Sequence, residues 1–280
     1  MKRSFWCCLL WINCLIISAQ TASETLEFAR LQAAQGYTAS ALKAYQRVLF
    51  FARDRYAGEC YAQLADLHAQ EGNYPRSAFY YDLLYHAAPN DSTRYAALFG
   101  KAGVLLLQHE YQKSLIELLA LDENIPEPWR SSRRLYLGAA YFGARDFNAA
   151  HDVLLKLLPD SADAQRRAEF ERLFEKTRKI ARKRPETATA LSVFIPGAGQ
   201  LYAGDVKNGL NSLLLNTALT LGFIAMTQTY SFSDALLTVT PWLFRYYAGG
   251  IKRTGIILEE KKEEKLRKKF RAVLTVLKKN

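Results

Sequence analysis

The sequence is poor in the residues that bind metals or act as nucleophiles. It has 280 residues, of which four are cysteine and four are histidine. Three of the cysteines, Cys7, Cys8 and Cys14, lie near the N-terminus, so removal of a signal there would leave Cys60 alone. One cysteine can form neither an intrachain disulfide nor a cysteine-based metal site.

Catalytic motifs are also missing. The four histidines, His68, His86, His109 and His151, have no carboxylate or second histidine at the spacing of a metal or catalytic pair. Patterns typical of nucleotide binding, serine hydrolases and zinc proteases are absent. The segment Gly197-Ala198-Gly199 lacks the strand, the third glycine and the acidic residue of a dinucleotide loop. We therefore expect no enzyme, no cofactor and no metal.

The excess of positive charge lies beside apolar segments. The net charge is +11, yet residues 4–175 carry −3 and residues 185–251 carry −1. Residues 1–3 carry +2, residues 176–184 carry +6 and residues 252–280 carry +7. Basic residues beside a membrane span usually face anionic lipid. This distribution favours membrane lipid as a partner and argues against nucleic acid.

Residues 1–22 have the pattern of a secretory signal peptide. Lys2 and Arg3 precede an apolar stretch from Phe5 to Ile17, and Ala19 offers a cleavage site. The apolar stretch is shorter than the about 20 residues that a spanning helix needs. We expect cleavage and export, and an uncleaved anchor is the alternative.

Residues 23–160 contain an internal repeat. Four segments align at Gly36, Gly72, His109 and Arg145, at spacings of 36, 37 and 36 residues. A period of this length is typical of stacked helical hairpins, in which each unit buries an apolar face against its neighbour. The signature positions are Tyr61, Ala65, Gly72, Tyr74, Pro89, Ala102, Tyr111, Gly138, Tyr141, Phe147 and Ala150.

The repeat pattern resembles the tetratricopeptide repeat, a helix-turn-helix unit of about 34 residues. The resemblance implies an all-α solenoid of four units whose surface binds a protein or peptide partner. Small residues at Ala65, Ala102 and Gly138 would let the two helices of a unit approach closely. Residues 161–185 are expected to form a charged helix that caps the solenoid and ends in the basic run beside the membrane.

Residues 186–251 form an apolar block that predicts a membrane hairpin module. Gly209–Thr229 is the clearest span, and Phe232–Ile251 is a second candidate. Residues 252–280 are expected to form a separate basic amphipathic helix, on the membrane surface or paired with another helix. Thr187–Ala203 either crosses the membrane, giving three crossings, or turns back, giving two. We favour three, because an odd number places the basic tail of an exported protein inside.

A glycine-rich stretch from Pro196 to Gly209 opens this module. Four glycines and a proline in fourteen residues exclude an ordinary helix interior and indicate a broken or re-entrant segment. Gln200 and Asn216 need hydrogen-bonding partners in hydrocarbon, so we expect them to tie the segments together. The motif positions are Pro196, Gly197, Gly199, Gln200, Tyr202, Gly204, Gly209, Asn216, Tyr246, Gly249 and Gly250.

The glycine-rich stretch resembles the core of a class of small bacterial membrane domains and is distantly similar to the two-transmembrane domain. The resemblance implies a compact anchor and, more weakly, a role beside membrane-protein insertion or envelope assembly. We expect an exported scaffold at the inner (cytoplasmic) membrane, whose repeats bind a partner in envelope assembly. The alternative is a membrane-active accessory factor, in which the module itself assists insertion, transport or lipid handling.

Overall fold

The computed structural model describes residues 21–159 and 163–278, and within them every regular element is a helix. The expected all-α class is therefore confirmed for the described part of the chain. The contacts divide the chain into two compact units, the first ending at Leu154 and the second beginning at Leu155. Most of the expected signal peptide, residues 1–22, lies outside the described residues.

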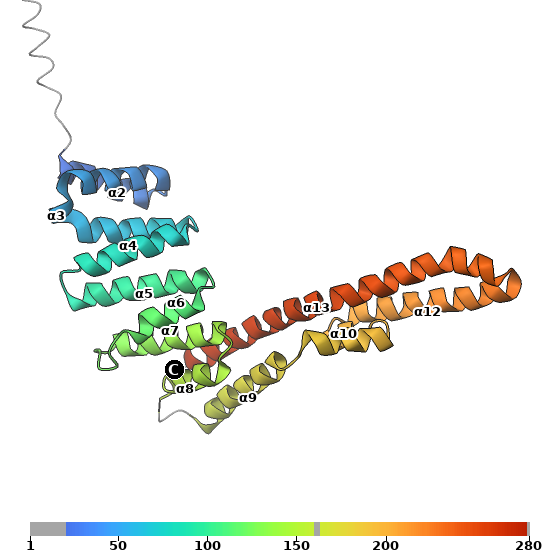
Figure 1. Ribbon diagram of the computed structural model, residues 1–280. Coiled ribbons are helices and arrows are strands. Elements are labelled where there is room, and N and C mark those ends of the chain that lie inside the picture. Colours follow the sequence, from blue (N-terminus) through green and yellow to red (C-terminus); the bar gives the residue numbers. More distant parts are fainter. Residues whose placement is uncertain (1–20, 160–162, 279–280) are drawn as a thin grey trace, which may run out of the picture. The chain divides into compact units, whose positions relative to one another are not determined.

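The first unit is a row of helices in which each packs against the next along the chain (Figure 1). α3 bends at Ala52, where φ is −147° and ψ is 44°, so its two halves lie in successive hairpins. The helices are α2 (Ala22–Ala34), α3 (Thr38–Gln70), α4 (Tyr74–Ala87), α5 (Asp91–Leu107), α6 (Tyr111–Leu119), α7 (Trp129–Gly143) and α8 (Phe147–Leu155).

The four aligned positions of the repeat adopt the same left-handed turn. Their φ angles are 78° at Gly36, 74° at Gly72, 62° at His109 and 65° at Arg145. Each turn has the two hydrogen bonds of a Schellman motif, one reaching back three residues and one reaching back five. The sequence period thus corresponds to a repeated backbone turn, which His109 and Arg145 adopt despite having a Cβ atom.

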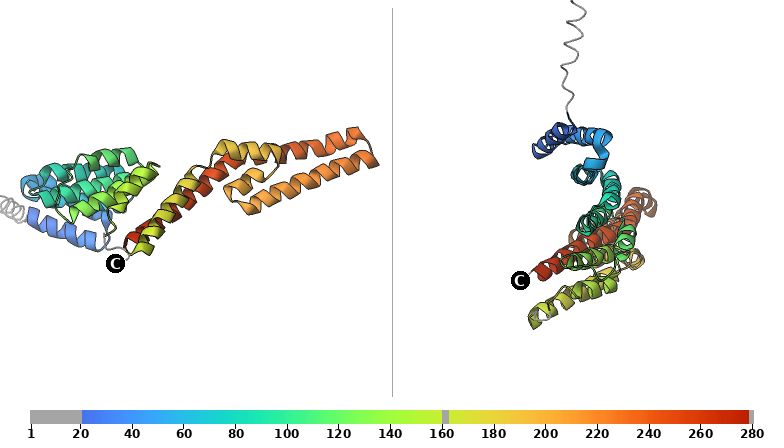
Figure 2. Two further views of the ribbon diagram at one scale, coloured as in Figure 1. Left: turned by 90° about the horizontal axis from the view of Figure 1, so that it is seen from below. Right: turned by 90° about the vertical axis from the view of Figure 1, so that its left-hand side faces the viewer.

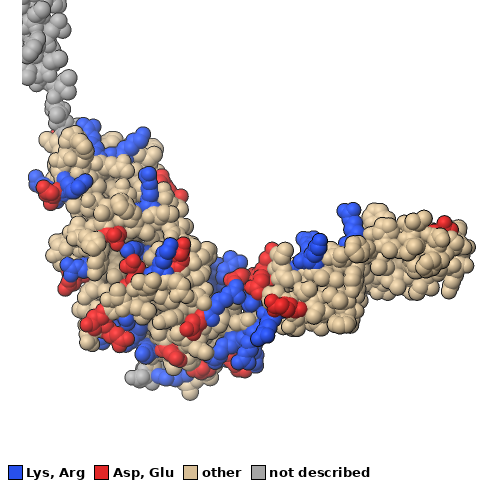
Figure 3. All heavy atoms as spheres, in the orientation of Figure 1, with Lys and Arg blue, Asp and Glu red and all other residues tan. Residues whose placement is uncertain are grey.

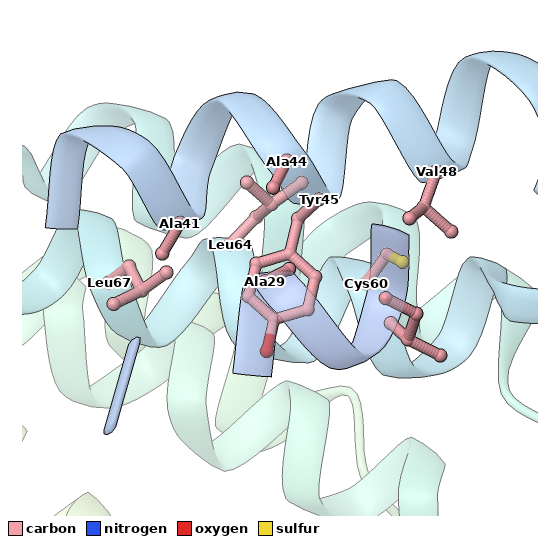
Figure 4. Packing of buried hydrophobic residues seen from close by; sticks show 9 residues of the cluster. Ala29, Ala41, Ala44, Tyr45, Val48, Cys60, Leu64 and Leu67 are labelled. Atoms are coloured by element: carbon pink, nitrogen blue, oxygen red, sulfur yellow. The ribbon is translucent and has the colours of Figure 1, made fainter. Parts of the chain in front are cut away.

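The core of the first unit forms where small residues allow helices to approach. Figure 4 shows Tyr45 and Leu64, from the two halves of α3, meeting beside Ala29 of α2. All three are buried, with exposed fractions of 1% or less. The close approach expected at Gly138 is present, because a Cβ atom there would lie 2.3 Å from Leu154 Cδ2.

The second unit is built around its longest helix. α9, α10, α11 and α12 all pack against α13, and α12 and α13 lie side by side as an antiparallel hairpin (Figures 1 and 2). The helices are α9 (Ala164–Ala181), α10 (Pro185–Phe194), α11 (Ala198–Ala203), α12 (Val206–Thr229) and α13 (Phe232–Lys278).

The expected boundary between residues 251 and 252 is wrong, because α13 continues through it without a break. Thr254 and Leu258, just beyond that boundary, are at most 1% exposed, so packing against other helices stabilises this part of α13.

The C-terminal end of α13 is bound by α9. The Arg166 guanidinium of α9 donates to the carbonyls of Val276 (2.8 Å) and Leu277 (2.9 Å). α9 is therefore fastened to α13, and the capping of the repeats by residues 161–185 stays a prediction.

The favoured crossing of the membrane by Thr187–Ala203 is also wrong. α10 and α11 pack against each other, and the Lys183 ammonium donates to the Tyr202 carbonyl at 2.5 Å. The two ends of the segment therefore lie together, which a segment that crosses a bilayer cannot do. α10 has ten residues, so it is about 15 Å long against a hydrocarbon core of about 30 Å.

Among the described residues, α12 alone is long and apolar enough to cross a membrane, with 24 residues and a mean hydropathy of 1.4 in its most apolar window. The expected second span, Phe232–Ile251, is helical but is not apolar enough to count as a candidate span, because it carries Asp234, Pro241 and Arg245.

Candidate functional site

Three buried polar side chains meet where α10, α11 and α13 converge, and we call them the polar core: Ser192, Gln200 and Thr254. Their exposed fractions are 2%, 3% and 0%. The Ser192 hydroxyl lies 3.1 Å from Thr254 Oγ1 and 3.4 Å from Gln200 Oε1, and it accepts a hydrogen bond from the Gly199 N–H at 3.1 Å. One hydroxyl therefore joins all three helices.

The Gly250 carbonyl completes the polar core. It accepts hydrogen bonds from Gln200 Nε2 at 3.3 Å and from the Thr254 hydroxyl at 2.8 Å. Each hydroxyl has one hydrogen, so while Thr254 donates to Gly250 the Ser192 hydroxyl donates to either Thr254 Oγ1 or Gln200 Oε1. The partners of these buried groups all lie within the protein. The members are hydroxyls and an amide, without a base to activate a nucleophile. The arrangement is suited to holding helices in register, as the sequence predicted for Gln200.

Glycines bring the backbones of the module into contact. Gly197 has a φ of 93°, and a Cβ atom there would lie 2.2 Å from the Gly209 carbonyl oxygen. A Cβ atom on Gly199 would lie 2.1 Å from the Ala188 carbonyl oxygen. Both positions are therefore closed to any residue with a side chain. Gly204 forms the left-handed turn into α12, with a φ of 87° and the same hydrogen bonds as the repeat turns.

Asn216 is the second polar residue that the sequence singled out, and it lies on α12. It is 5% exposed, and its Nδ2 donates to the Ser212 carbonyl one turn back at 2.8 Å. Its Oδ1 has no hydrogen-bonding partner among the described residues. The expected tie between segments is therefore present at Gln200, whereas the bond formed by Asn216 stays within its own helix.

Three lysines donate to backbone carbonyls near the C-terminal end of α11, and we call Lys183, Lys262 and Lys265 the lysine collar. Lys262 is buried, and the other two are half-buried. Besides its bond to the Tyr202 carbonyl, the Lys183 ammonium lies 4.7 Å from the centre of the Tyr202 ring. Lys265 donates to the Ala203 carbonyl at 3.0 Å, and Lys262 donates to the Lys183 carbonyl at 3.3 Å. Burial, together with the charge of Lys265, lowers the pKa of Lys183. Cations here satisfy carbonyls that the short helix leaves free.

The sequence motif and the observed site overlap incompletely. Tyr246 and Gly249, both expected in the motif, lie outside the polar core. Tyr246 is 41% exposed and stacks on Trp242, and a Cβ atom on Gly249 would contact nothing within 4 Å. Pro196 is half-buried in the turn between α10 and α11. Sequence reasoning missed Ser192, Thr254 and the lysine collar, although Thr254 stands one helical turn after Gly250.

The repeat-signature residues fill the core and turns of the first unit. Ala65, Ala102 and Ala150 are fully buried, and Tyr61 and Phe147 are under 10% exposed. The remaining positions serve as turn, packing or helix-end residues. Gly72 forms a turn, Gly138 contacts Leu154, Tyr74, Tyr111 and Tyr141 are half-buried, and Pro89 is exposed after α4.

The described residues contain no group of three or more histidine, cysteine, aspartate or glutamate side chains placed to hold a metal ion. Comparison of the chain with protein-family models, curated proteins and solved structures found no match.

Proposed function

We propose that this chain is a membrane-anchored scaffold, in which the α12–α13 hairpin enters the bilayer and the first unit binds a protein or peptide partner. The observation that carries the proposal is the exposure of α12. Only 11% of the most apolar 18-residue stretch of α12 is buried. Leu214 and Leu221 are 68% and 61% exposed. Such a surface is unfavourable in water and fits a lipid environment.

The length of the hairpin supports insertion. Ser212 and Gly250 lie at one level, because a Cβ atom on Gly250 would be 3.4 Å from Ser212 Oγ. From this level to Tyr230 at the tip, α12 rises by about 27 Å. This rise is close to the about 30 Å of the hydrocarbon core. The hairpin therefore fits a bilayer from one interface to the other.

Charge supports the same placement. From residue 208 to residue 251, Asp234 and Arg245 are the only charged side chains. Figure 3 shows the outer part of the α12–α13 hairpin almost free of charged side chains. Lys207, Lys252 and Arg253 are exposed at its base. Cations at this level are suited to contact anionic headgroups, at about 1 kcal/mol each.

The partner-binding part of the proposal depends on the first unit. Its four repeated turns and stacked hairpins agree with the tetratricopeptide resemblance, whose units bind peptides and proteins. Large apolar side chains remain exposed on it, among them Phe50, Phe51 and Phe79 at 82%, 69% and 56%. We infer a partner in bacterial envelope assembly, with the repeats on the exported face of the inner membrane because of the signal pattern.

A second candidate function is a membrane-active accessory factor that assists insertion, transport or lipid handling. Asn216 favours it, because a buried amide oxygen without a partner in an apolar helix is a typical functional feature of membrane segments. The polar core disfavours it, because its hydrogen bonds close within the protein. We therefore rank this function below the scaffold.

Truncation tests the anchor. A chain ending at Pro159 keeps the first unit whole, whereas a cut at residue 186 would leave α9 without α13, against which it packs. Expressed with its signal, the chain ending at Pro159 should be recovered in the soluble fraction with a helical circular dichroism spectrum. Sedimentation of this folded fragment with membranes would contradict the proposal.

A further inference from the structure

The last turn of α10 and the residue that follows it carry four exposed apolar side chains, which we call the wedge: Leu191, Val193, Phe194 and Ile195. Their exposed fractions are 39%, 45%, 85% and 55%. Phe194 is more exposed than any other large apolar side chain in the described residues. Exposed apolar residues that are adjacent in the chain are unfavourable in water, so their exposure needs an explanation.

The wedge lies beside the apolar hairpin at a shallow depth. A Cβ atom on Gly197, which follows the wedge, would lie 2.2 Å from the Gly209 carbonyl oxygen and 3.2 Å from the Leu213 nitrogen. The Tyr247 hydroxyl of α13 donates to the Val193 carbonyl. Gly209 and Leu213 are two and six residues beyond Lys207, so the wedge reaches about 3–9 Å past that cation toward the hairpin tip. This depth matches the boundary between headgroups and acyl chains.

The segment returns to the side from which it entered. The lysine collar binds the ends of the α10–α11 hairpin together, and α12 and α13 then continue alone for about 27 Å. Four helices therefore lie at the headgroup level on the side where the hairpin enters, and only α12 and α13 continue through the hydrocarbon to the opposite side. The cross-section of the module is larger at the headgroups of one leaflet than at those of the other.

We propose that the wedge inserts into this one leaflet and makes the module prefer strongly convex bilayer surfaces. A convex leaflet has gaps between its headgroups, and shallow apolar groups such as Phe194 and Ile195 fill them. This inference rests on the proposed membrane anchoring. It adds that the partner surface is a curved phospholipid leaflet, contacted from the side that holds α9 and the end of α13.

The test uses the full chain made by cell-free synthesis in a mixture of vesicles with diameters of ~30 nm and ~200 nm, each carrying its own dye, at equal lipid surface. Both populations contain phosphatidylcholine and phosphatidylglycerol in the same ratio. Flotation followed by size separation gives the protein bound per unit of lipid surface. The chain should favour the small vesicles about threefold or more.

The decisive variant is Phe194→Ser/Ile195→Ser, and the matched control is Phe50→Ser/Phe51→Ser, an equally exposed pair in the first unit. The wedge variant should still bind both vesicles through α12, but the amounts bound to small and to large vesicles per unit of lipid surface should be nearly equal. The control variant, and the conservative Phe194→Leu/Ile195→Leu variant, should keep the preference for small vesicles. Circular dichroism checks that each variant is helical.

Two different failures are distinguishable in this experiment. Equal incorporation of the unaltered chain into both vesicles, or an unchanged preference in the Phe194→Ser/Ile195→Ser variant, would overturn the wedge and leave the anchor intact. Failure of the unaltered chain to float with either vesicle would overturn the proposed anchoring itself.

Discussion

At the scale of single residues, His68 is the clearest case of a buried titratable group. It is 3% exposed and stacks on Tyr80, with ring centroids 5.5 Å apart. Burial lowers its pKa, although the Glu71 carboxylate, 3.6 Å from Nδ1, acts in the opposite direction. Folding therefore favours the neutral ring, as expected of an imidazole taken out of water.

The free energy of unfolding should consequently fall as the pH drops below the ordinary histidine pKa of about 6.5, because the unfolded chain binds a proton that the folded chain disfavours. His68→Phe keeps the stack on Tyr80 and removes the titrating group, so the free energy of unfolding should change less with pH in this variant. His86→Phe, at an exposed site, is the control. Urea unfolding between pH 5 and 8 measures both, and equal slopes in the two variants would contradict the interpretation.

Gln200 gives the corresponding test of the polar core. Gln200→Leu leaves the Ser192 hydroxyl and the Gly250 carbonyl each without one bond, which should cost about 1–3 kcal/mol. Gln228→Leu, at an exposed position of α12, is the matched control and should have little effect. The midpoint of thermal unfolding in detergent distinguishes them. A stable Gln200→Leu protein that has lost its biological activity would instead favour the accessory-factor function.

At the scale of elements, the turns are the most repeated feature of the chain. The same Schellman hydrogen bonds close the helices before Gly36, Gly72, His109, Arg145 and Gly204. The positive φ angle explains why glycine recurs at these sites. The same turn therefore ends helices in both units, although the units differ in hydropathy.

Two motif glycines should respond oppositely to alanine. Gly197→Ala introduces a Cβ atom 2.2 Å from the Gly209 carbonyl oxygen at a φ of 93°, so it should destabilise the module by more than the about 1–2 kcal/mol of a left-handed alanine. Gly249→Ala meets nothing within 4 Å inside α13 and should stabilise it by about 0.5–1 kcal/mol. Thermal unfolding in detergent measures both. Equal midpoints would contradict the close approach of α11 and α12.

At the scale of the whole molecule, the structure makes membrane topology testable. If the hairpin enters a bilayer as proposed, the contact of Arg166 with Val276 and Leu277 places α9 and the C-terminal end of α13 on the same side of it. The signal pattern assigns that side to the exterior, whereas the basic runs at residues 176–184 and 252–280 favour the interior. These two sequence arguments oppose each other, and labelling decides between them.

The topology can be tested with single cysteines at Lys43, Tyr230 and Lys278, in a protein with Cys7, Cys8 and Cys14 changed to serine. An impermeant maleimide, added from one side of the membrane at a time, should divide these cysteines into two groups. Lys43→Cys and Lys278→Cys should label from the same face, and Tyr230→Cys from the opposite face. Burial raises the pKa of Cys60 to about 12, so that thiol should stay silent. Labelling of Lys278→Cys together with Tyr230→Cys would exclude the two-crossing hairpin.

Local patterns were sufficient to predict much of this fold. The period of about 36 residues located the four turns of the first unit, because a left-handed turn favours the same small set of residues each time. The apolar run at Gly209–Thr229 located α12. The proline and glycines at 196–209 predicted a broken segment, and Gln200 was correctly expected to tie the module together.

Other features depended on contacts between distant residues. The return of the α10–α11 hairpin depends on a contact 19 positions apart, from Lys183 to Tyr202. The contacts that hold α13 join residues about 60 to 110 positions apart, as from Ser192 to Thr254 and from Arg166 to Val276. Tyr246 and Gly249 matched a motif but make no contact with the polar core: Tyr246 stacks on Trp242, and a Cβ atom on Gly249 would meet nothing within 4 Å. No local pattern distinguishes these cases, because burial by another segment decides them.

The sequence by itself thus determined the helical class, the positions of the turns and the location of the apolar helix, all of which follow from backbone preference and hydropathy within a few residues. The tertiary structure decided that the glycine-rich segment turns back, that the basic tail continues the second helix of the hairpin, and that the wedge remains exposed. Those outcomes depend on which distant groups satisfy the carbonyls and apolar faces that each short helix leaves free.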